Sequence, residues 1–298
     1  MSYAELPLLE FQKRFATEAA CADALERARW PEGFVCPRCG HDDATRLRTR
    51  RLLQCTLCYH QASVTAGTVL HKTRTPLVKW FWAMWLVAQD KGGVSALRLS
   101  KQLGLGYRTA WSMLHKLRKA MGQRDTLYTL TGSIEMDDAY FGGAATGKRG
   151  RGAANKTPAV VMVENRGERA GFLAIKTVTT MSKAQVEIAA AKIAPGQRIH
   201  TDGLNAYNTL TALGHSHHAE VIPPDQAHEK LPWVHTAISN AKRFLLGTYH
   251  GVSHKYLQAY LDEFCYRFNR RAWEATLTSR LMLACATAKP ITFAELKA

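Results

Sequence analysis

The sequence predicts a multidomain α+β protein with a cysteine-rich ribbon, a pair of short helices and a larger α/β layered domain. Two pairs of cysteines come early in the 298-residue chain, two helical patterns separated by a glycine turn follow, and beyond Asp125 apolar strand patterns alternate with helical ones. Such alternation is typical of a sheet whose faces are covered by helices. The chain is long enough to form more than one compact unit.

The cysteine pairs Cys36-Pro-Arg-Cys39 and Cys55-Thr-Leu-Cys58 form two C-x2-C motifs separated by fifteen residues. This spacing is typical of a site in which four thiolates hold one Zn²⁺ ion. Because four thiolates leave no open coordination position, the expected zinc is structural, and its binding would stabilise a segment too small for a core of its own. Free or redox-active thiol pairs are the alternative.

Helical patterns are expected before and after this ribbon. Apolar residues recur at spacings of three and four over residues 7–30, and Thr75-Pro76 is expected to open a helix as cap and first-turn proline.

The longest apolar run, Trp80 to Ala88, has nine residues, whereas a bilayer span needs about 20. No membrane association is therefore expected. The amino end lacks a signal-peptide pattern and the cysteines are paired at metal-site spacing, which favours a reducing, cytoplasmic location.

The charge distribution indicates a polyanion partner. The chain has 40 Lys and Arg against 24 Asp and Glu, a formal charge of +16 and a pI near 9.7. Residues 44–134 contain 15 basic residues and two acidic ones, which accounts for +13 of this charge. A solvated basic face is the alternative reading.

Two helical patterns inside this basic stretch, residues 95–103 and 107–121, are separated by Gly104-Leu105-Gly106. The arrangement predicts a helix-turn-helix whose second helix reads double-stranded DNA. Arg108, Thr109 and Lys116 would lie on the outward side of that helix. The alternative is a helical hairpin that only packs against its neighbours.

Acidic residues interrupt the first strand pattern after the helices. The expected strand 133–141 carries Glu135, Asp137 and Asp138, and a buried strand rarely carries three acids unless they are neutralised. Another acid, Asp202, ends a later strand at 198–201, and carboxylates at neighbouring strand ends can bind hard divalent cations. Alternation along a strand sends Glu135 and Asp137 to one face and Asp138 to the other. For Asp202 alone, capping of the next helix is the alternative.

The remaining α/β pattern is regular. Further strands are expected at 159–164, 172–178 and 219–222, and helices at 183–193, 204–213, 233–246 and 255–269.

Several motifs carry a family resemblance in their order along the chain. They are Glu135-Met-Asp-Asp-Ala-Tyr-Phe-Gly-Gly143, Thr201-Asp-Gly203 with Ala206-Tyr207, the run Ser239–Ser253 and the run Tyr260–Arg271. With the cysteine pairs, they resemble the DDE-type transposases of bacterial insertion sequences, in particular those with an amino-terminal zinc ribbon (ISXO-like, insertion-sequence 1595 family). The resemblance covers the chain from the ribbon to about Arg271.

This resemblance implies a ribonuclease-H-like α/β catalytic domain with a mixed sheet and a metal-binding triad. Asp137 and Asp202 match the first two acids. The third position normally carries Glu, with a basic residue seven positions later; Lys242 matches the basic residue, and counting back seven gives His235. Some members of the group use His or Asn there. Asn240 and Glu229 remain alternatives, as does a site of two acids in which His235 is structural. An imidazole ligand suits Mn²⁺ better than Mg²⁺.

The implied activity is metal-dependent cleavage at the ends of an insertion sequence and strand transfer into target DNA, by two-metal phosphoryl transfer with Mg²⁺ or Mn²⁺. Lys242 would hold a DNA phosphate. Lys148, Arg149 and Arg151, in a glycine-rich loop, would grip the DNA backbone. Expected partners are the terminal inverted repeats, the target and further copies of the chain, at least a dimer, in the bacterial nucleoid. The alternatives are a non-catalytic DNA-binding regulator on a degenerate nuclease fold and a structure-specific nuclease.

The expected domain boundaries follow. We expect an amino-terminal helical segment (1–33), a zinc ribbon (34–72), a helix-turn-helix domain (73–125), a ribonuclease-H-like catalytic domain (126–275) and a carboxy-terminal tail (276–298).

Overall fold

The chain forms two compact units. The structure, a computed structural model, describes residues 7–47, 50–142, 156–221, 223 and 226–297. The first unit comprises Met1–Arg124 with Trp273–Ala298 and the second Asp125–Ala272, so the second is inserted into the sequence of the first. None of the described helices combines the length and the apolar composition needed to cross a membrane.

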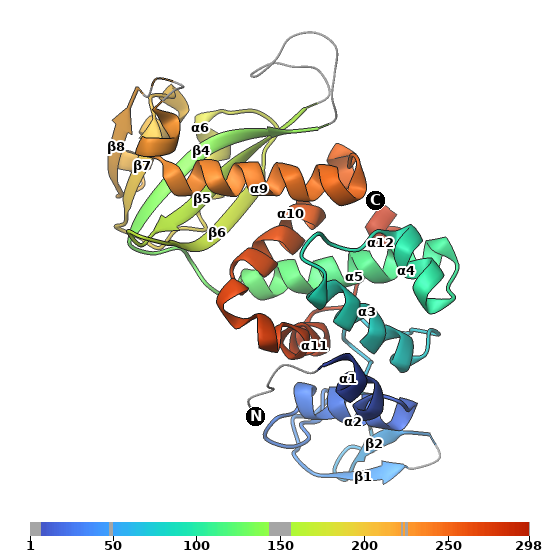
Figure 1. Ribbon diagram of the computed structural model, residues 1–298. Helices are drawn as coiled ribbons and strands as arrows, with labels where there is room; N and C mark the ends of the chain where they lie inside the picture. Colours follow the sequence, from blue (N-terminus) through green and yellow to red (C-terminus); the bar gives the residue numbers. More distant parts are fainter. Residues whose placement is uncertain (1–6, 48–49, 143–155, 222, 224–225, 298) are drawn as a thin grey trace. The chain divides into compact units, whose positions relative to one another are not determined.

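The first unit combines helices with a small antiparallel sheet of order β1-β2-β3 (Figure 1). Its elements are α1 (Leu8–Arg14), α2 (Glu18–Arg29), β1 (Ala44–Leu47), β2 (Leu52–Cys55), β3 (Gln61–Ala62), α3 (Leu77–Gln89), α4 (Ala96–Leu103), α5 (Tyr107–Asp125), α11 (Leu277–Thr287) and α12 (Phe293–Lys297). A 3-10 turn, η2 (Arg271–Thr276), precedes α11. Helix α11 packs against both α2 and α3, which ties the last segment of the chain to the first.

The prediction of a single helix over residues 7–30 is wrong, because the helix is interrupted between α1 and α2. The Thr17 side chain accepts a hydrogen bond from the Ala20 backbone N–H at 3.2 Å, which starts α2 afresh. Phe11 and Phe15, on either side of the end of α1, are buried against aromatic rings of α3.

The start of α3 also differs from the expectation that Thr75 caps it. Its N-cap is Pro76, which has no side-chain acceptor. Instead, the two carboxylate oxygens of Glu18, in α2, accept hydrogen bonds from the backbone N–H groups of Leu77 and Val78, each at 2.9 Å. A carboxylate is favourable at this end of a helix because the unpaired N–H groups make it positive.

Helices α4 and α5 lie where the two helical patterns predicted them. Helix α4 ends at Gly104, whose φ of 57° is left-handed and favours glycine. The short α12 packs on α5 in this unit: Phe293 contacts the Trp111 ring, and the Arg108 guanidinium lies 4.9 Å from the Phe293 ring centre.

The second unit is a five-stranded mixed sheet of order β6-β5-β4-β7-β8. Its strands are β4 (Ser133–Phe141), β5 (Thr157–Asn165), β6 (Ala170–Thr177), β7 (Arg198–Asp202) and β8 (Ser216–Glu220). Strands β4, β5 and β6 pair antiparallel, whereas β7 runs parallel to both β4 and β8. The first four strands lie at the predicted places. The fifth, predicted at 219–222, starts earlier, because three histidines in residues 215–218 hid its pattern.

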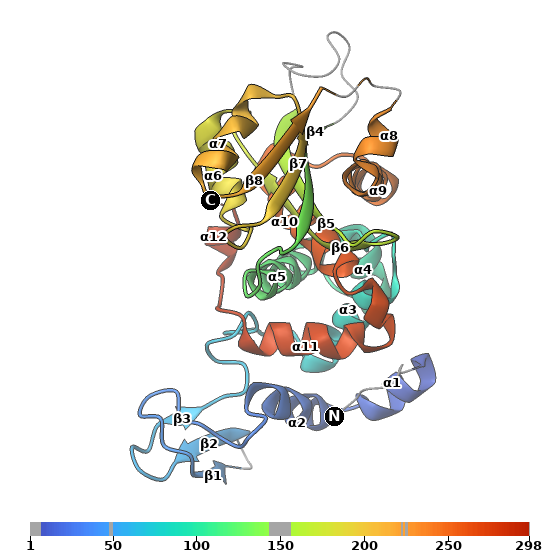
Figure 2. The same cartoon turned by 90° about the vertical axis from the view of Figure 1, so that its left-hand side faces the viewer.

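Helices cover both faces of this sheet. On one face, α9 (Pro232–Tyr249) and α10 (His254–Phe268) pack apolar side chains against β4, β5 and β6 (Figure 1). On the other face, α6 (Lys183–Ala190), η1 (Asn205–Asn208) and α7 (Thr209–Ala212) form a second core (Figure 2). A short helix, α8 (Ala227–Lys230), precedes α9. Alternate residues of β4 therefore point into different cores, with Ile134 and Met136 toward α6 and Ala139 and Phe141 toward α9.

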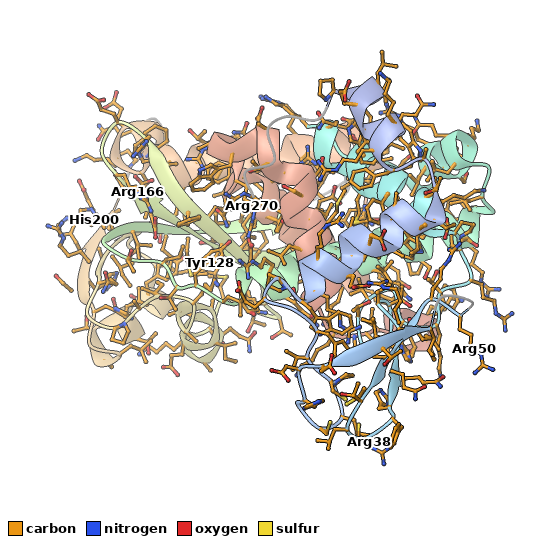
Figure 3. The ribbon with its side chains drawn as sticks, turned by 90° about the horizontal axis from the view of Figure 1, so that it is seen from below. Arg38, Arg50, Tyr128, Arg166, His200 and Arg270 are labelled. Atoms are coloured by element: carbon orange, nitrogen blue, oxygen red, sulfur yellow. The ribbon has the colours of Figure 1, made fainter. Side chains whose placement is uncertain are left out.

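A buried ion pair joins the two ends of the second unit. Arg270 donates to Asp125 Oδ1 at 2.7 Å, and Asn269 donates to Asp125 Oδ2 at 3.1 Å. Only 8% of the Arg270 side chain and 13% of the Asp125 side chain are exposed. Lys192 donates further hydrogen bonds to the carbonyl oxygens of Asp125 and Tyr128. Tyr128 and Arg270 are labelled in Figure 3.

Replacing Arg270 with Met should destabilise the second unit by about 3 kcal/mol, because Asp125 would stay buried without its cation. Urea unfolding of the full chain, followed by circular dichroism, measures this loss. Lys230→Ala, which removes the partner of Glu220 in a pair with side chains 45% and 42% exposed, is the control and should change nothing measurable. Equal unfolding curves for Arg270→Met and Lys230→Ala would contradict the prediction.

Candidate metal centres and their surroundings

The four cysteines of the two C-x2-C motifs converge. Their sulfur atoms all lie within 4.8 Å of one another, and the Cys36–Cys58 and Cys39–Cys55 sulfur pairs are each 3.6 Å apart. A tetrahedral zinc ion with Zn–S bonds of about 2.3 Å requires sulfur separations of about 3.8 Å. The sulfur positions therefore fit a four-thiolate zinc site.

The two cysteine turns share one backbone design. In each turn the first cysteine donates its N–H to the carbonyl five residues on, from Cys36 to His41 and from Cys55 to His60. The residue after the second cysteine has a left-handed backbone: Gly40 has φ 77° and Tyr59 has φ 56°. Glycine adopts this conformation without strain, whereas Tyr59, 71% exposed, does so at a cost.

Hydrogen bonding also prepares the first cysteine for a metal. Desolvation raises the pKa of the Cys36 thiol, but hydrogen bonds from the backbone N–H groups of Arg38 and Cys39, together with those from the side chains of Cys39 and Cys58, outweigh it and lower the pKa to about 6. A lowered pKa favours the thiolate, which is the form that binds metals.

The basic residues around the ribbon are not equivalent. Arg46 is paired with acids, at 2.5 Å from Glu26 and 3.9 Å from Asp23. Arg50 and Arg51, in contrast, are exposed and line a cavity of about 440 Å³ together with Arg74 (Figure 3 labels Arg50). The cavity also contains Glu18, whose carboxylate is occupied by the start of α3.

Three carboxylates meet where β4 and β7 separate. One oxygen each of Asp137, Asp138 and Asp202 lies within 4.8 Å of the others. The parallel pairing of β4 with β7 ends at Met136 and Thr201, so the two strands present Asp137 and Asp202 next to each other just beyond it. Asp202 also accepts the Leu204 N–H at 3.1 Å.

Asp138 was expected on the opposite face of the strand, yet its carboxylate belongs to this group. Because β7 stops pairing before this point, β4 has an open edge at Asp137 and Asp138, and side chains from either face can reach round it. The backbone N–H of Asp138 donates to Asp137 Oδ1 at 2.7 Å. Alternation along the strand did not foresee this grouping.

His235 lies beside the group but is not a member of it. Its Nδ1 is 3.7 Å from Asp137 Oδ2, with 23% of the His235 side chain and 14% of the Asp137 side chain exposed. Among the described residues, neither His235 nor Glu229 contributes an atom to the three-carboxylate group. Asn240 follows on the same helix, α9, and is half-buried.

Lys242 lies two helical turns beyond His235 and so on the same side of α9. Partial burial, and then the nearby positive charge of Lys156, lower the pKa of its ammonium, while Asp137 acts in the opposite direction. The structure therefore brings Asp137, Asp138, Asp202, His235 and Lys242 into one neighbourhood.

Glu135 has a role that the sequence analysis missed. It is 2% exposed, and its Oε2 accepts hydrogen bonds from the backbone N–H groups of Trp233 and Val234, both at 2.8 Å. Burial raises its pKa, although these two hydrogen bonds and one from Asn165 oppose the shift. The carboxylate thus binds the first turn of α9, the helix that carries His235.

The residues expected to contact DNA differ in their exposure to solvent. Arg108 is exposed, whereas Thr109 and Lys116 are half-buried, and burial lowers the pKa of Lys116. Lys148, Arg149 and Arg151 lie outside the described residues.

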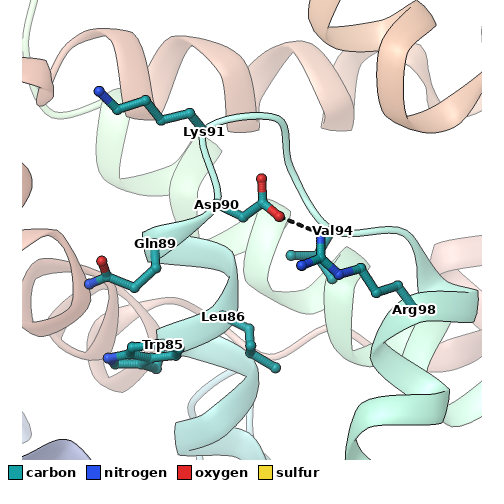
Figure 4. Close-up of a pocket in the computed structure, with 7 residues that line it drawn as sticks. All are labelled: Trp85, Leu86, Gln89, Asp90, Lys91, Val94 and Arg98. Atoms are coloured by element: carbon teal, nitrogen blue, oxygen red, sulfur yellow. Dashed lines mark hydrogen bonds and ion pairs between the residues drawn. The ribbon is translucent and has the colours of Figure 1, made fainter. Parts of the chain in front are cut away.

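A further cavity, of about 330 Å³, lies between the end of α3 and α4 (Figure 4). Asp90 and Arg98 form an ion pair there at 2.5 Å, and Trp85 and Val94 also line it. None of the residues predicted to bind metal or DNA lines this cavity.

Replacing Tyr59 with Gly should stabilise the zinc-bound ribbon by about 1 kcal/mol, because glycine removes the strain of the left-handed backbone. Zinc affinity, measured by competition with a chromophoric chelator, should rise roughly fivefold. Leu57→Gly, at an exposed position of the same turn without a positive φ, is the control and should not gain affinity. Weaker zinc binding by Tyr59→Gly would refute the argument.

Two family models match the parts of the chain that contain the four cysteines and the three carboxylates. Residues 16–61 match the family described as transposase zinc-ribbon domain, and residues 129–269 match the ISXO2-like transposase domain. A protein of Halobacterium salinarum, described as an uncharacterized protein in transposable element ISH50, is 25% identical over 216 residues, covering 66% of this chain and 71% of the relative.

Two solved structures show a weaker similarity. The crystal structure of the Mos1 strand transfer complex has a TM-score of 0.28 and 12% identity, covering 72% of this chain and 78% of that chain. The pre-cleavage Mos1 transpososome has a TM-score of 0.24 and 12% identity, covering 70% and 78%. These scores are too low to support an argument. The two matched domains, in their order along the chain, identify it as a member of the ISXO2-like (IS1595) family of insertion-sequence transposases.

Proposed function

We propose that the second unit is the catalytic domain of a metal-dependent transposase that cleaves DNA at the ends of its insertion sequence and joins the ends to a target. The observation that carries the proposal is the grouping of Asp137, Asp138 and Asp202, with Lys242 nearby. Three acids this close together repel one another unless cations neutralise them. The mixed sheet with acids at adjacent strand ends supports a ribonuclease-H-like assignment.

The donor set fits Mg²⁺ or Mn²⁺. Carboxylate oxygens are the ligands that these hard cations prefer, and the imidazole of His235 favours Mn²⁺. When bound, such ions activate the attacking oxygen and stabilise the leaving oxygen of a phosphodiester. Asp137 lies next to Asp202 across the strand pair and next to His235 on α9. Asp137 and Asp202, with Asp138 or His235, would therefore hold the ions.

Lys242 contributes charge rather than acid–base chemistry in this proposal. It is exposed on the surface of α9, two turns from His235, so its ammonium can contact a DNA phosphate that approaches the carboxylates. The opposing charge of Asp137 acts on the Lys242 ammonium, which supports its nearness to the carboxylates.

Substitution at the carboxylates should remove cleavage and joining. Asp202→Ala should lower the rate by more than about a hundredfold, since loss of a ligand's supporting partners alone costs 10–100-fold. The assay uses DNA carrying the gene's own flanking ends, with Mn²⁺ or Mg²⁺. Glu168→Ala, an exposed acid of the same unit, is the control and should stay active.

The same assay identifies the third ligand. If Asp138 completes the site, Asp138→Ala loses activity and His235→Ala retains part of it; if His235 does, the reverse holds, and His235→Glu restores activity with Mg²⁺. Binding of the ends without cleavage by wild type would favour a non-catalytic regulator. Cleavage without joining would favour a structure-specific nuclease.

We also propose that the first unit holds a structural Zn²⁺ ion and binds the DNA. The sulfur geometry supports the zinc. The exposed guanidinium groups of Arg50, Arg51 and Arg74, grouped around one cavity, support a phosphate-binding surface. The helix-turn-helix formed by α4 and α5, with Arg108 exposed on it, would read the terminal repeats, and Lys148, Arg149 and Arg151 would add backbone contacts. We further infer that at least two copies of the chain act together, because two ends of the element have to be joined.

The cavity lined by Arg50, Arg51 and Arg74 allows a test of DNA binding with Arg46 as the control. The double change Arg51→Ala and Arg74→Ala should weaken DNA binding at all sequences and reduce the slope of log affinity against log salt by about 2, since each phosphate contact contributes roughly 0.9. Arg46→Ala removes the same charge per residue, but this arginine is already paired with Glu26 and Asp23.

Fluorescence anisotropy over a series of salt concentrations provides the measurement. Arg46→Ala should leave the slope unchanged. An equal loss of slope per charge removed in Arg46→Ala and in the Arg51→Ala, Arg74→Ala double variant would show that only total charge matters, and would contradict a defined phosphate surface.

A further inference from the structure

We propose that Glu135 is a positioning residue of the metal site: by binding the first turn of α9 it holds His235 beside Asp137. The inference rests on the proposed function, because it concerns the same site. It goes beyond that function in assigning a task to a buried acid that does not itself reach the carboxylate group.

The start of α9 needs an acceptor that its own sequence lacks. Leu231, the N-cap, offers no side-chain hydrogen bond, and Pro232 follows it at the first helical position. Proline has no N–H, so the first unpaired donors are the backbone N–H groups of Trp233 and Val234. Val234 is fully buried, so water does not reach it. Without an acceptor, these two donors would be left unsatisfied at a considerable cost.

Glu135 Oε2 meets both donors at 2.8 Å. The other oxygen, Oε1, accepts from Asn165 Nδ2 at 2.8 Å, and Asn165 Oδ1 accepts the Gly167 N–H at 2.8 Å. The Gly167 carbonyl in turn accepts from the Trp233 indole at 3.1 Å. Glu135, Asn165, Gly167 and Trp233 thus form a closed ring of hydrogen bonds, here named the α9 clasp.

The clasp stands directly next to the metal site on both elements. Asp137 lies two residues after Glu135 on the same face of β4, and His235 lies one residue after Val234 on α9. Two consecutive contacts therefore join β4 to α9: Glu135 to the backbone of Trp233 and Val234, and Asp137 to the ring of His235 at 3.7 Å. A shift of the first helical turn would move His235 relative to Asp137.

An apolar residue at position 135 would be cheaper to bury than a carboxylate. The α9 clasp explains why a carboxylate is present at position 135. One of its oxygens accepts from both helix donors, while the second oxygen accepts from Asn165.

Glu164 provides a matched control for a purely structural role. It is 1% exposed on the neighbouring strand β5, and like Glu135 it accepts hydrogen bonds from two backbone N–H groups, those of Thr131 and Phe172, both at 3.0 Å. It also pairs with Arg166 at 2.6 Å. None of these partners belongs to α9.

The experiment compares Glu135→Ala, Glu135→Gln and Glu164→Ala in the full chain by two measurements. Hydrogen exchange in the absence of metal reports the backbone N–H groups of Trp233 and Val234. Calorimetric titration with Mn²⁺, with Asp202→Ala as the blank, reports the site. We expect Glu135→Ala to accelerate exchange at both amides and to weaken Mn²⁺ binding about tenfold. Glu135→Gln, whose single amide oxygen can still accept from both helix donors but which loses the acceptor for Asn165, should recover part of both. Glu164→Ala should lower the melting temperature but change neither readout.

Several results would overturn the proposal that Glu135 positions His235. Unchanged exchange at Trp233 and Val234 in Glu135→Ala would overturn the proposal, as would an equal loss of Mn²⁺ affinity in Glu164→Ala. If Glu135→Ala does not fold, the smaller change Asn165→Ala, which removes one member of the clasp, should shift both readouts in the same direction, and failure to do so would also overturn it. If wild type binds no Mn²⁺ that Asp202→Ala lacks, the proposed function fails, while the exchange measurement still decides the role of Glu135.

Discussion

A helix whose amino end is buried must find hydrogen-bond acceptors for its first N–H groups, and the structure of this transposase depends on how that need is met. Pro76 is the N-cap of α3 and Pro232 is the first residue of α9, and neither helix has a capping side chain of its own. In each case a glutamate distant in sequence, Glu18 or Glu135, supplies the carboxylate. Because such contacts are made only in the folded state, they tie α2 to α3 in one unit and β4 to α9 in the other. The position of the carboxylate group relative to α9 follows from the second of these contacts.

Local patterns were sufficient to predict most of the second unit. The sequence pattern predicted the observed bounds of β4, although that strand contributes residues to two cores, one on each face. Alternation alone placed the Asp138 carboxylate away from Asp137, but β7 stops pairing at Met136, so the side chain can reach round the open edge of β4 to join the group. Alternation also failed for β8, an edge strand whose histidines and exposed residues give no apolar signal. Glu135 could not be assigned from sequence, because its partners lie about a hundred residues away.

The net charge predicted a polyanion as partner, but it did not identify which basic residues would bind that partner. Several basic side chains in the basic stretch have internal tasks: Arg46 pairs with acids of α2, and Arg98 pairs with Asp90. Arg29, outside that stretch, donates to the carbonyl oxygens of Ser63 and Val64 and so braces the ribbon from α2. A sequence lists all of these as equal positive charges. Only their partners separate the cations that stabilise the fold from those, such as Arg50 and Arg51, that remain exposed to solvent.

The insertion of the second unit into the first also sets an order of events during synthesis. Residues 125–272 leave the ribosome as a continuous block, and the pair Asp125–Arg270 can close as soon as that block is complete. The first unit has to wait longer, because α11, which packs on α2 and α3, is translated after it. Domains generally fold as units as they emerge. A nascent chain would therefore carry the folded second unit before the ribbon-bearing unit is finished, and the side of α3 that α11 covers would stay exposed until α11 has been made.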